Sequence, residues 1–169
     1  MTFSGDSNQI TSGGTNTLNA ALTATNATFS GAENVDTTNI NAGYTVSGTT
    51  TINGGKVNFA SSTPAILGQT LVINDGHVTF AAAVTEVDQY IQTGGTLSGP
   101  GELRVSSTTL SGGSMLGPGK FIIDGSVGGQ LVNQGTLGAN GNNLVLNGPV
   151  TGSGAHVRPL SRRRRTDKR

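Results

Sequence analysis

The chain repeats short stretches of its own sequence at a spacing of about twenty residues. GGTLSGPGELRV at 94–105 is followed by GGSMLGPGKFII at 112–123, and QGTLGANGNNLVL at 134–146 continues the series. Earlier in the chain, INGGKVNF at 52–59 returns as INDGHVTF at 73–80. Repeats of this length are typical of solenoids, in which one unit can bury its apolar face only by stacking on its neighbours.

Apolar residues alternate with polar ones inside the repeats, which predicts short strands with one buried face. The alternating pairs are Tyr44 and Val46, Val57 and Phe59, Leu71 and Ile73, Val78 and Phe80, Leu103 and Val105, Phe121 and Ile123, and Leu144 and Leu146. Glycine-, asparagine- and proline-rich stretches lie between them and supply the backbone conformations that tight corners need. We expect residues one repeat apart to stack, with Phe59 on Phe80 inside the coil and Asn53 on Asn74 at a corner.

These patterns predict an all-β fold, a single-stranded parallel β-helix (β-solenoid) with about 20 residues per coil. A β-sandwich of antiparallel hairpins is the alternative, because alternation alone does not exclude it. Similarity between successive units favours the solenoid, since sandwich strands have no reason to resemble one another at a fixed period. We predict solenoid repeats over 41–154, irregular N-terminal coils or a cap over 1–40, and a disordered basic tail over 155–169.

Composition agrees with a strand-rich fold. Gly, Thr, Ser and Asn make up nearly half of the 169 residues, and the strong helix formers are scarce. There is no cysteine, which excludes disulfides and thiolate metal sites. No apolar run is long enough to span a membrane, and the N-terminus MTFSGDSNQITSGG has neither the basic nor the apolar segment of a secretory signal. We therefore expect the chain to be part of a larger precursor if it is extracellular.

The chain's acidic residues give little support for catalysis. Enzymatic β-helices that cut polysaccharides need two or three carboxylates gathered on one face, often with Ca²⁺ or an arginine. Most acids here are isolated, and only Glu86 and Asp88 are two residues apart, so that on a strand they would share a face. We expect a solvated surface pair there, because charged residues usually lie on exposed faces.

Other candidate motifs also have ordinary structural explanations. His77 takes the place of Lys56 in the repeat, which suggests an exposed position, and His156 is far away in the sequence, so no zinc site is predicted. Thr-x-Thr occurs at 15–17, 23–25 and 49–51 but not at one phase of the repeat, and the β-propensity of threonine explains it. We predict no catalytic, cofactor-binding or metal-binding residue, and no cofactor.

Charge divides the chain into two parts. Through Val157 there are three basic residues against eight acidic ones, whereas Arg158–Arg169 (RPLSRRRRTDKR) holds seven basic residues and one acidic residue. Such a tail can bind nucleic acid weakly and non-specifically through phosphates, but it lacks the aromatic residues that stack on bases. We expect no specific nucleic-acid partner, and treat the tail as a disordered appendage.

Lines such as IQTGGTLSGPGELRVSSTTLSGGSMLGPGKFIIDG (91–125) resemble the bacterial surface β-strand-repeat proteins, including filamentous haemagglutinin-like adhesins and autotransporter passenger domains. The resemblance covers about residues 41–154. It implies a right-handed parallel β-helix stalk, secreted or displayed at the cell surface, that projects or adheres.

That resemblance leads to the expected function, a structural or adhesive segment that binds glycan or a host or cell surface and is not an enzyme. The alternative is a fragment of a polysaccharide-acting β-helix enzyme or of a phage tail-spike. No membrane span is expected, and the oligomeric state is open.

Overall fold

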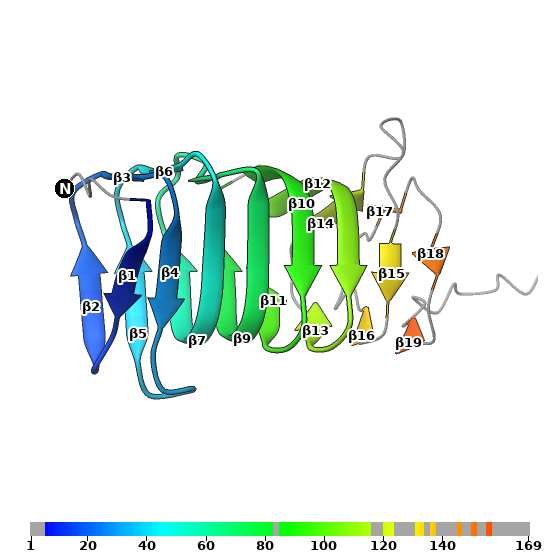
Figure 1. Ribbon diagram of the computed structural model, residues 1–169, viewed down its shortest axis with the longest axis horizontal. Helices are drawn as coiled ribbons and strands as arrows, with labels where there is room; N and C mark the ends of the chain where they lie inside the picture. The colour runs from blue at the N-terminus through cyan, green and yellow to red at the C-terminus, as the bar shows by residue number, and fades with distance from the viewer. Residues whose placement is uncertain are drawn as a thin grey trace, which may run out of the picture.

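The computed structural model describes residues 6–82, 85–115 and 120–123, together with the short strand segments 131–133, 136–137, 145–146, 150–151 and 155–156. Over these residues the chain winds into a β-solenoid of about 6 turns, with equivalent positions roughly 19 residues apart and no helix (Figure 1). Every strand pairing is parallel, so the solenoid is confirmed and the antiparallel sandwich is wrong. Right-handed coiling stays a prediction.

The solenoid is built from short strands, with four longer ones in its middle. The strands are β1 (Asn8–Thr11), β2 (Thr15–Leu18), β3 (Leu22–Ala24), β4 (Ala27–Ser30), β5 (Thr37–Ile40), β6 (Tyr44–Val46), β7 (Thr49–Phe59), β8 (Ile66–Leu67), β9 (Thr70–Phe80), β10 (Thr85–Gln92), β11 (Thr96–Ser98), β12 (Glu102–Leu110), β13 (Ser114–Met115), β14 (Lys120–Ile123), β15 (Leu131–Asn133), β16 (Thr136–Leu137), β17 (Val145–Leu146), β18 (Val150–Thr151) and β19 (Ala155–His156).

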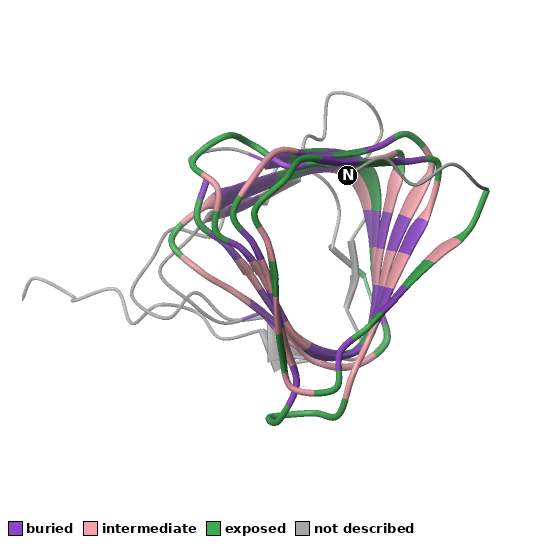
Figure 2. Cartoon of the chain, turned by 90° about the vertical axis from the view of Figure 1, so that its left-hand side faces the viewer, coloured by how far each residue is buried: buried purple, intermediate pink, exposed green. Residues whose placement is uncertain are grey.

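Seen along its axis, the solenoid has a three-sided outline (Figure 2). Side one holds β1, β4, the first halves of β7 and β9 and the second halves of β10 and β12. Side two holds β2, β5, the second halves of β7 and β9, then β11 and β13. Side three holds β3, β6 and β8, followed by the first halves of β10 and β12 and by β14. The long strands β7 and β9 therefore turn the corner side by side, and their pairing shifts register there, between Ile52 and Lys56.

Glycine makes the corner between sides one and two possible. Gly55, Gly76, Gly95 and Gly113 occupy this corner in successive coils, and all have positive φ, between 64° and 86°. A Cβ on Gly76 would collide with the carbonyl oxygen of Gly55, and a Cβ on Gly95 would collide with that of Gly76. The coils approach so closely here that both the dihedral angle and the space require glycine.

The predicted inward residues form the core. Leu71, Ile73 and Val78 are fully buried, and Phe80 is 3% exposed. The rings of Phe59 and Phe80 stack with centroids 5.0 Å apart and planes 20° from parallel. That separation is close to the spacing of neighbouring strands in a sheet, so the predicted aromatic ladder is confirmed.

The predicted amide ladder is also present. Asn74 Nδ2 donates to Asn53 Oδ1 over 2.9 Å. The ladder extends one coil further than predicted, because Thr93 Oγ1 donates to Asn74 Oδ1 over 2.9 Å. Side-chain hydrogen bonds thus run parallel to the axis and join three successive coils at this corner.

A network of buried polar groups lies inside the coils, around Tyr90 and Gln92 of β10. The hydroxyl of Tyr90 donates to Gln92 Oε1 over 2.9 Å. The two N–H groups of Gln92 Nε2 in turn lie within hydrogen-bond distance of three carbonyl oxygens, those of Gly94, Gly95 and Ser114, at 3.1 to 3.2 Å. Because Tyr90 and Gln92 are both fully buried, these bonds supply partners that water cannot.

Residues 8–40 form coils that are continuous with the rest. β1 pairs with β4 and β2 with β5, each in register along its whole length. The irregular apolar spacing of this region comes from the loop at 31–36, where Val35 is 71% exposed. The buried carboxylate of Asp36 holds the loop by accepting hydrogen bonds from the backbone N–H groups of Gly14 and Ala32 at 2.6 and 2.7 Å.

The C-terminal prediction is tested only in part. Ala155 and His156 form β19, which pairs with β16. Residues 157–169, which make up most of the predicted tail, lie outside the described residues, so disorder of the tail stays a prediction.

Phe80 and Thr79 provide a matched test of the strand phase. Phe80→Asp should lower the free energy of unfolding by about 3 kcal/mol or more, because it places an unpaired charge in the aromatic ladder. Thr79→Asp, whose side chain points outward, should cost less than about 1 kcal/mol. Urea denaturation followed by circular dichroism measures both, and equal losses would contradict the observed phase.

The two tyrosines should ionise only when the protein unfolds. Burial raises the pKa of Tyr44 and Tyr90 well above the ordinary value near 10, to which the unfolded chain returns. Their contribution to stability is therefore fully present below about pH 10 and is lost as pH rises toward the folded-state pKa. Phenolate absorbance in an alkaline titration should appear together with loss of circular dichroism. Titration near pH 10 with the fold intact would contradict the burial of both rings.

Candidate functional site

The outward residues of side two form two columns that we call the polar ladder. One column contains Thr15, Thr37, Lys56, His77, Thr96 and Ser114, and the other contains Thr17, Asn39, Asn58, Thr79 and Ser98. Their position follows from strand alternation, since the residues between them point into the core. From the coil of β5 onward these side chains are half-buried by their neighbours in the column.

Hydrogen bonds link the polar ladder from coil to coil. Asn58 Nδ2 donates to Asn39 Oδ1 over 2.8 Å, and Thr79 Oγ1 donates to Asn58 Oδ1. Ser98 Oγ lies 2.7 Å from His77 Nε2, so the bond crosses from one column to the other. A face whose amides and hydroxyls are held in this way loses little side-chain entropy when it binds a ligand.

His77 and Lys56 are direct neighbours in the polar ladder. Their backbones are paired in the β7–β9 register, as the repeat alignment indicated. Burial, with a further contribution from the positive charge of Lys56, lowers the pKa of His77 below its usual value. The imidazole is therefore neutral at pH 7. His156 pairs with Leu137 in the backbone, and its side chain lies outside the described residues.

Side three carries a shallow hollow that collects charged groups. It is lined by Gly68, Glu86, Val87, Asp88, Arg104, Val105, Ser106 and Ile122. Glu86 and Asp88 are both exposed at its edge, on the same face of β10, as their spacing indicated. The partner of Glu86 on the next coil is Arg104, a neighbour that the spacing of the acidic residues alone does not indicate.

Arg104 lies between two glutamates. Its Nε is 2.5 Å from Glu102 Oε1, and its Nη1 is 3.7 Å from Glu86 Oε1. The Glu102 side chain is 11% exposed, whereas that of Glu86 is 70% exposed. Both glutamates are therefore engaged by one guanidinium, Glu102 in a close ion pair and Glu86 at longer range. The chemistry of the hollow is that of a surface ion-pair network.

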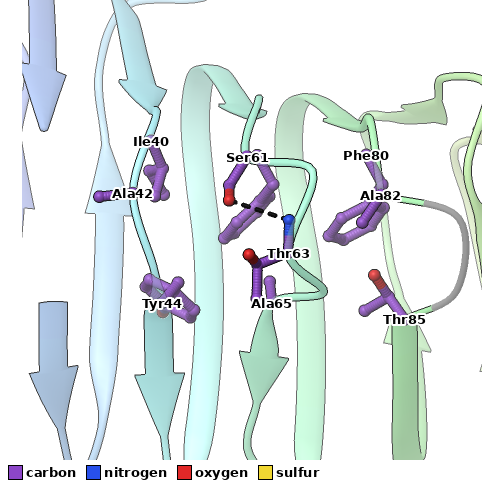
Figure 3. A pocket seen from close by; sticks show the side chains of 10 residues that line it. Ile40, Ala42, Tyr44, Ser61, Thr63, Ala65, Phe80, Ala82 and Thr85 are labelled. Atoms are coloured by element: carbon purple, nitrogen blue, oxygen red, sulfur yellow. Dashed lines mark hydrogen bonds between the residues drawn. The ribbon is translucent and has the colours of Figure 1, made fainter. Parts of the chain in front are cut away.

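A second cavity lies inside the coils behind the polar ladder (Figure 3). Its lining includes Tyr44, Phe59, Phe80 and Thr85, and the hydroxyl of Thr85 is buried without a hydrogen-bond partner in the protein. The space open to the centre of a water molecule is about 10 Å³, which fits about one water. This cavity is too small for a sugar or a cofactor.

The three Thr-x-Thr motifs lie on different sides of the solenoid. Thr15 and Thr17 are in β2 on side two, Thr23 is in β3 on side three, and Thr49 and Thr51 are in β7 on side one. They form no continuous threonine array within the part of the chain that the structure describes.

Among the residues that the structure describes, no group of three or more His, Cys, Asp or Glu side chains could hold a metal ion. The described residues also include no helix long and apolar enough to cross a membrane. No protein-family model, no curated protein and no solved structure matches this chain.

Arg104 should contribute more to stability than its exposed partner Glu86. Arg104→Met removes the ion pair of the largely buried Glu102 and should lower the free energy of unfolding by about 1–2 kcal/mol. Glu86→Gln breaks only an exposed contact and should cost less than about 0.5 kcal/mol. Thermal denaturation at low ionic strength compares the two variants. A larger loss for Glu86→Gln would show that the hollow depends on a different pair.

Proposed function

We propose that this chain is a structural and adhesive segment of a secreted or surface-displayed bacterial repeat protein, and that it is not an enzyme. In this proposal it forms part of a larger precursor and binds glycans through the polar ladder. The observation that carries the proposal is the polar ladder itself, in which amides and hydroxyls are aligned and hydrogen-bonded over successive coils.

The shape of the solenoid supports a projecting role. Parallel strands stack at about 4.8 Å, so about six turns extend roughly 30 Å along the axis. Each coil contacts mainly its neighbours, and further coils would lengthen such a rod without a change of fold. A stalk of this kind holds a binding face at a fixed distance from its point of attachment.

The chemistry of the polar ladder supports glycan as the partner. Sugars present many hydroxyl groups that both donate and accept hydrogen bonds, and the side chains of Asn39, Asn58, Thr79 and Ser98 offer the same two capabilities. Regular spacing of these groups along the axis suits a ligand that repeats. The resemblance of the repeats to bacterial adhesins leads to the same proposal.

A polysaccharide-acting enzyme is the second candidate. It is favoured by the hollow of side three, where Glu86, Asp88 and Arg104 lie together. The ion pairs of Arg104 weaken it, because they already engage the glutamates that a substrate would have to contact. Release of reducing ends from a polysaccharide, abolished by Glu86→Gln, would support this candidate over the first.

Paired double variants test the adhesive function. Asn58→Ala with Thr79→Ala removes the centre of the polar ladder and should weaken binding to the best-bound glycan of an oligosaccharide panel by about tenfold or more. Thr51→Ala with Thr70→Ala makes a similar change on side one and should leave affinity unchanged. Surface plasmon resonance measures binding, and melting temperatures check that both variants fold. Absence of binding to every glycan, or equal losses for the two doubles, would overturn the proposal.

A further inference from the structure

Two basic side chains lie side by side at the centre of side two. Lys56 and His77 face outward from adjacent strands at paired positions, and both are half-buried. Among the described residues, Lys56 forms no ion pair with a carboxylate, and the charge of Lys56 acts on His77. This is the one place on the described part of side two where basic side chains gather.

The nearby carboxylates serve other purposes. Asp36 accepts hydrogen bonds from the backbone of Gly14 and Ala32, and Asp75 accepts one from the N–H of Gly76 over 2.8 Å. The outward residues of β5 and β11, which flank the pair, are threonine, asparagine and serine. Lys56 and His77 therefore have neutral hydrogen-bonding neighbours within the polar ladder.

Protonation of His77 would place a second positive charge directly opposite Lys56 on the neighbouring strand, which is destabilising, and no opposing charge on the polar ladder compensates. A ligand anion would supply the missing charge.

We propose that Lys56 and His77, with Asn58, Thr79 and Ser98 beside them, bind the carboxylate of an acidic sugar within a glycan chain. The inference rests on the proposed function and names the class of glycan. The ammonium group of Lys56 pairs with the carboxylate, and the imidazole of His77 donates a hydrogen bond to it. The side-chain amide of Asn58 and the hydroxyls of Thr79 and Ser98 form hydrogen bonds with the ring hydroxyls of the sugar.

An acidic glycan fits this face better than nucleic acid does. Single-stranded nucleic acid is bound by proteins through exposed aromatic side chains that stack on bases. The described aromatic residues Phe29, Tyr44, Phe59, Phe80, Tyr90 and Phe121 are all buried. A site with one lysine and one histidine also neutralises too few phosphates for strong binding to a duplex.

Protonation of His77 should be coupled to binding. In the free protein, burial and Lys56 both disfavour the imidazolium, and the carboxylate of a ligand favours it. Affinity should therefore rise as pH falls through the titration range of histidine, while the carboxylate of the sugar stays ionised. Lys56 on β7 shares the column of His77, Asp75 lies two residues before it on its own strand, and the outward residues of β11 beside it are the neutral Thr96 and Ser98.

The experiment titrates the full chain with a short oligogalacturonate and with its methyl ester, a neutral ligand of the same size. Isothermal titration calorimetry at about pH 7.5 and about pH 5.5 gives the affinities, and the imidazole resonances in NMR spectra report the protonation of His77. We expect the acid to bind about tenfold or more tightly than the ester, with the difference growing at the lower pH.

Three variants assign the effect to residues. Lys56→Gln and His77→Gln should each remove most of the preference for the acid while weak binding of the ester remains. Lys120→Gln makes the same change of net charge as Lys56→Gln, but Lys120 lies in β14, outside side two, and its variant should bind like the wild type. Melting temperatures confirm that each variant folds.

The outcomes separate this inference from the proposed function. If the acid and the ester bind equally and Lys56→Gln has no effect, the acidic-sugar site is wrong while glycan binding stands. If neither ligand nor any other glycan binds, both fail. A short duplex DNA that competes with the acid, in a manner sensitive to Lys56→Gln, would overturn the choice of glycan.

Discussion

Parallel backbone pairing between consecutive coils is the constraint on which the whole structure depends. One coil of about 19 residues has too few apolar side chains to enclose a core of its own. When coils stack in register, Ile52 lies beside Ile73 and Phe59 beside Phe80, and each coil closes the core of the next. The tight corners follow from this, because positions such as Gly76 leave no room for a side chain between adjacent backbones.

Stacking also determines the chemistry of the surface. Whatever residue points outward in one coil has the equivalent residue of the next coil about 4.8 Å away. Amides in such columns bond to one another, as in Asn53 with Asn74 and Asn39 with Asn58. Opposite charges in a column form ion pairs, as Glu86 and Arg104 do on side three, whereas basic side chains in a column disfavour each other's protonation, as Lys56 does for His77 on side two.

These two charge arrangements suit different roles. The Glu86, Arg104 and Glu102 network is satisfied internally and fastens neighbouring coils. Among the described residues, Lys56 and His77 have no negatively charged neighbour on the polar ladder, so an anionic ligand could supply that charge. Under the proposed function, the ion pairs of side three would hold neighbouring coils together and the polar ladder of side two would bind the ligand.

The sequence by itself determined the period, the strand phase and the stacking of Phe59 on Phe80 and of Asn53 on Asn74, because each follows from residues that recur at a fixed offset. It also placed His77 beside Lys56 through the same alignment. Only the tertiary structure decided how the coils divide into three sides, and with this the network of Tyr90, Gln92 and Ser114 and the ion pairs of Arg104. Coil lengths vary, and the register shifts at the corner between Ile52 and Lys56. Contacts between side chains that do not occupy equivalent repeat positions therefore cannot be read from a fixed offset in the sequence.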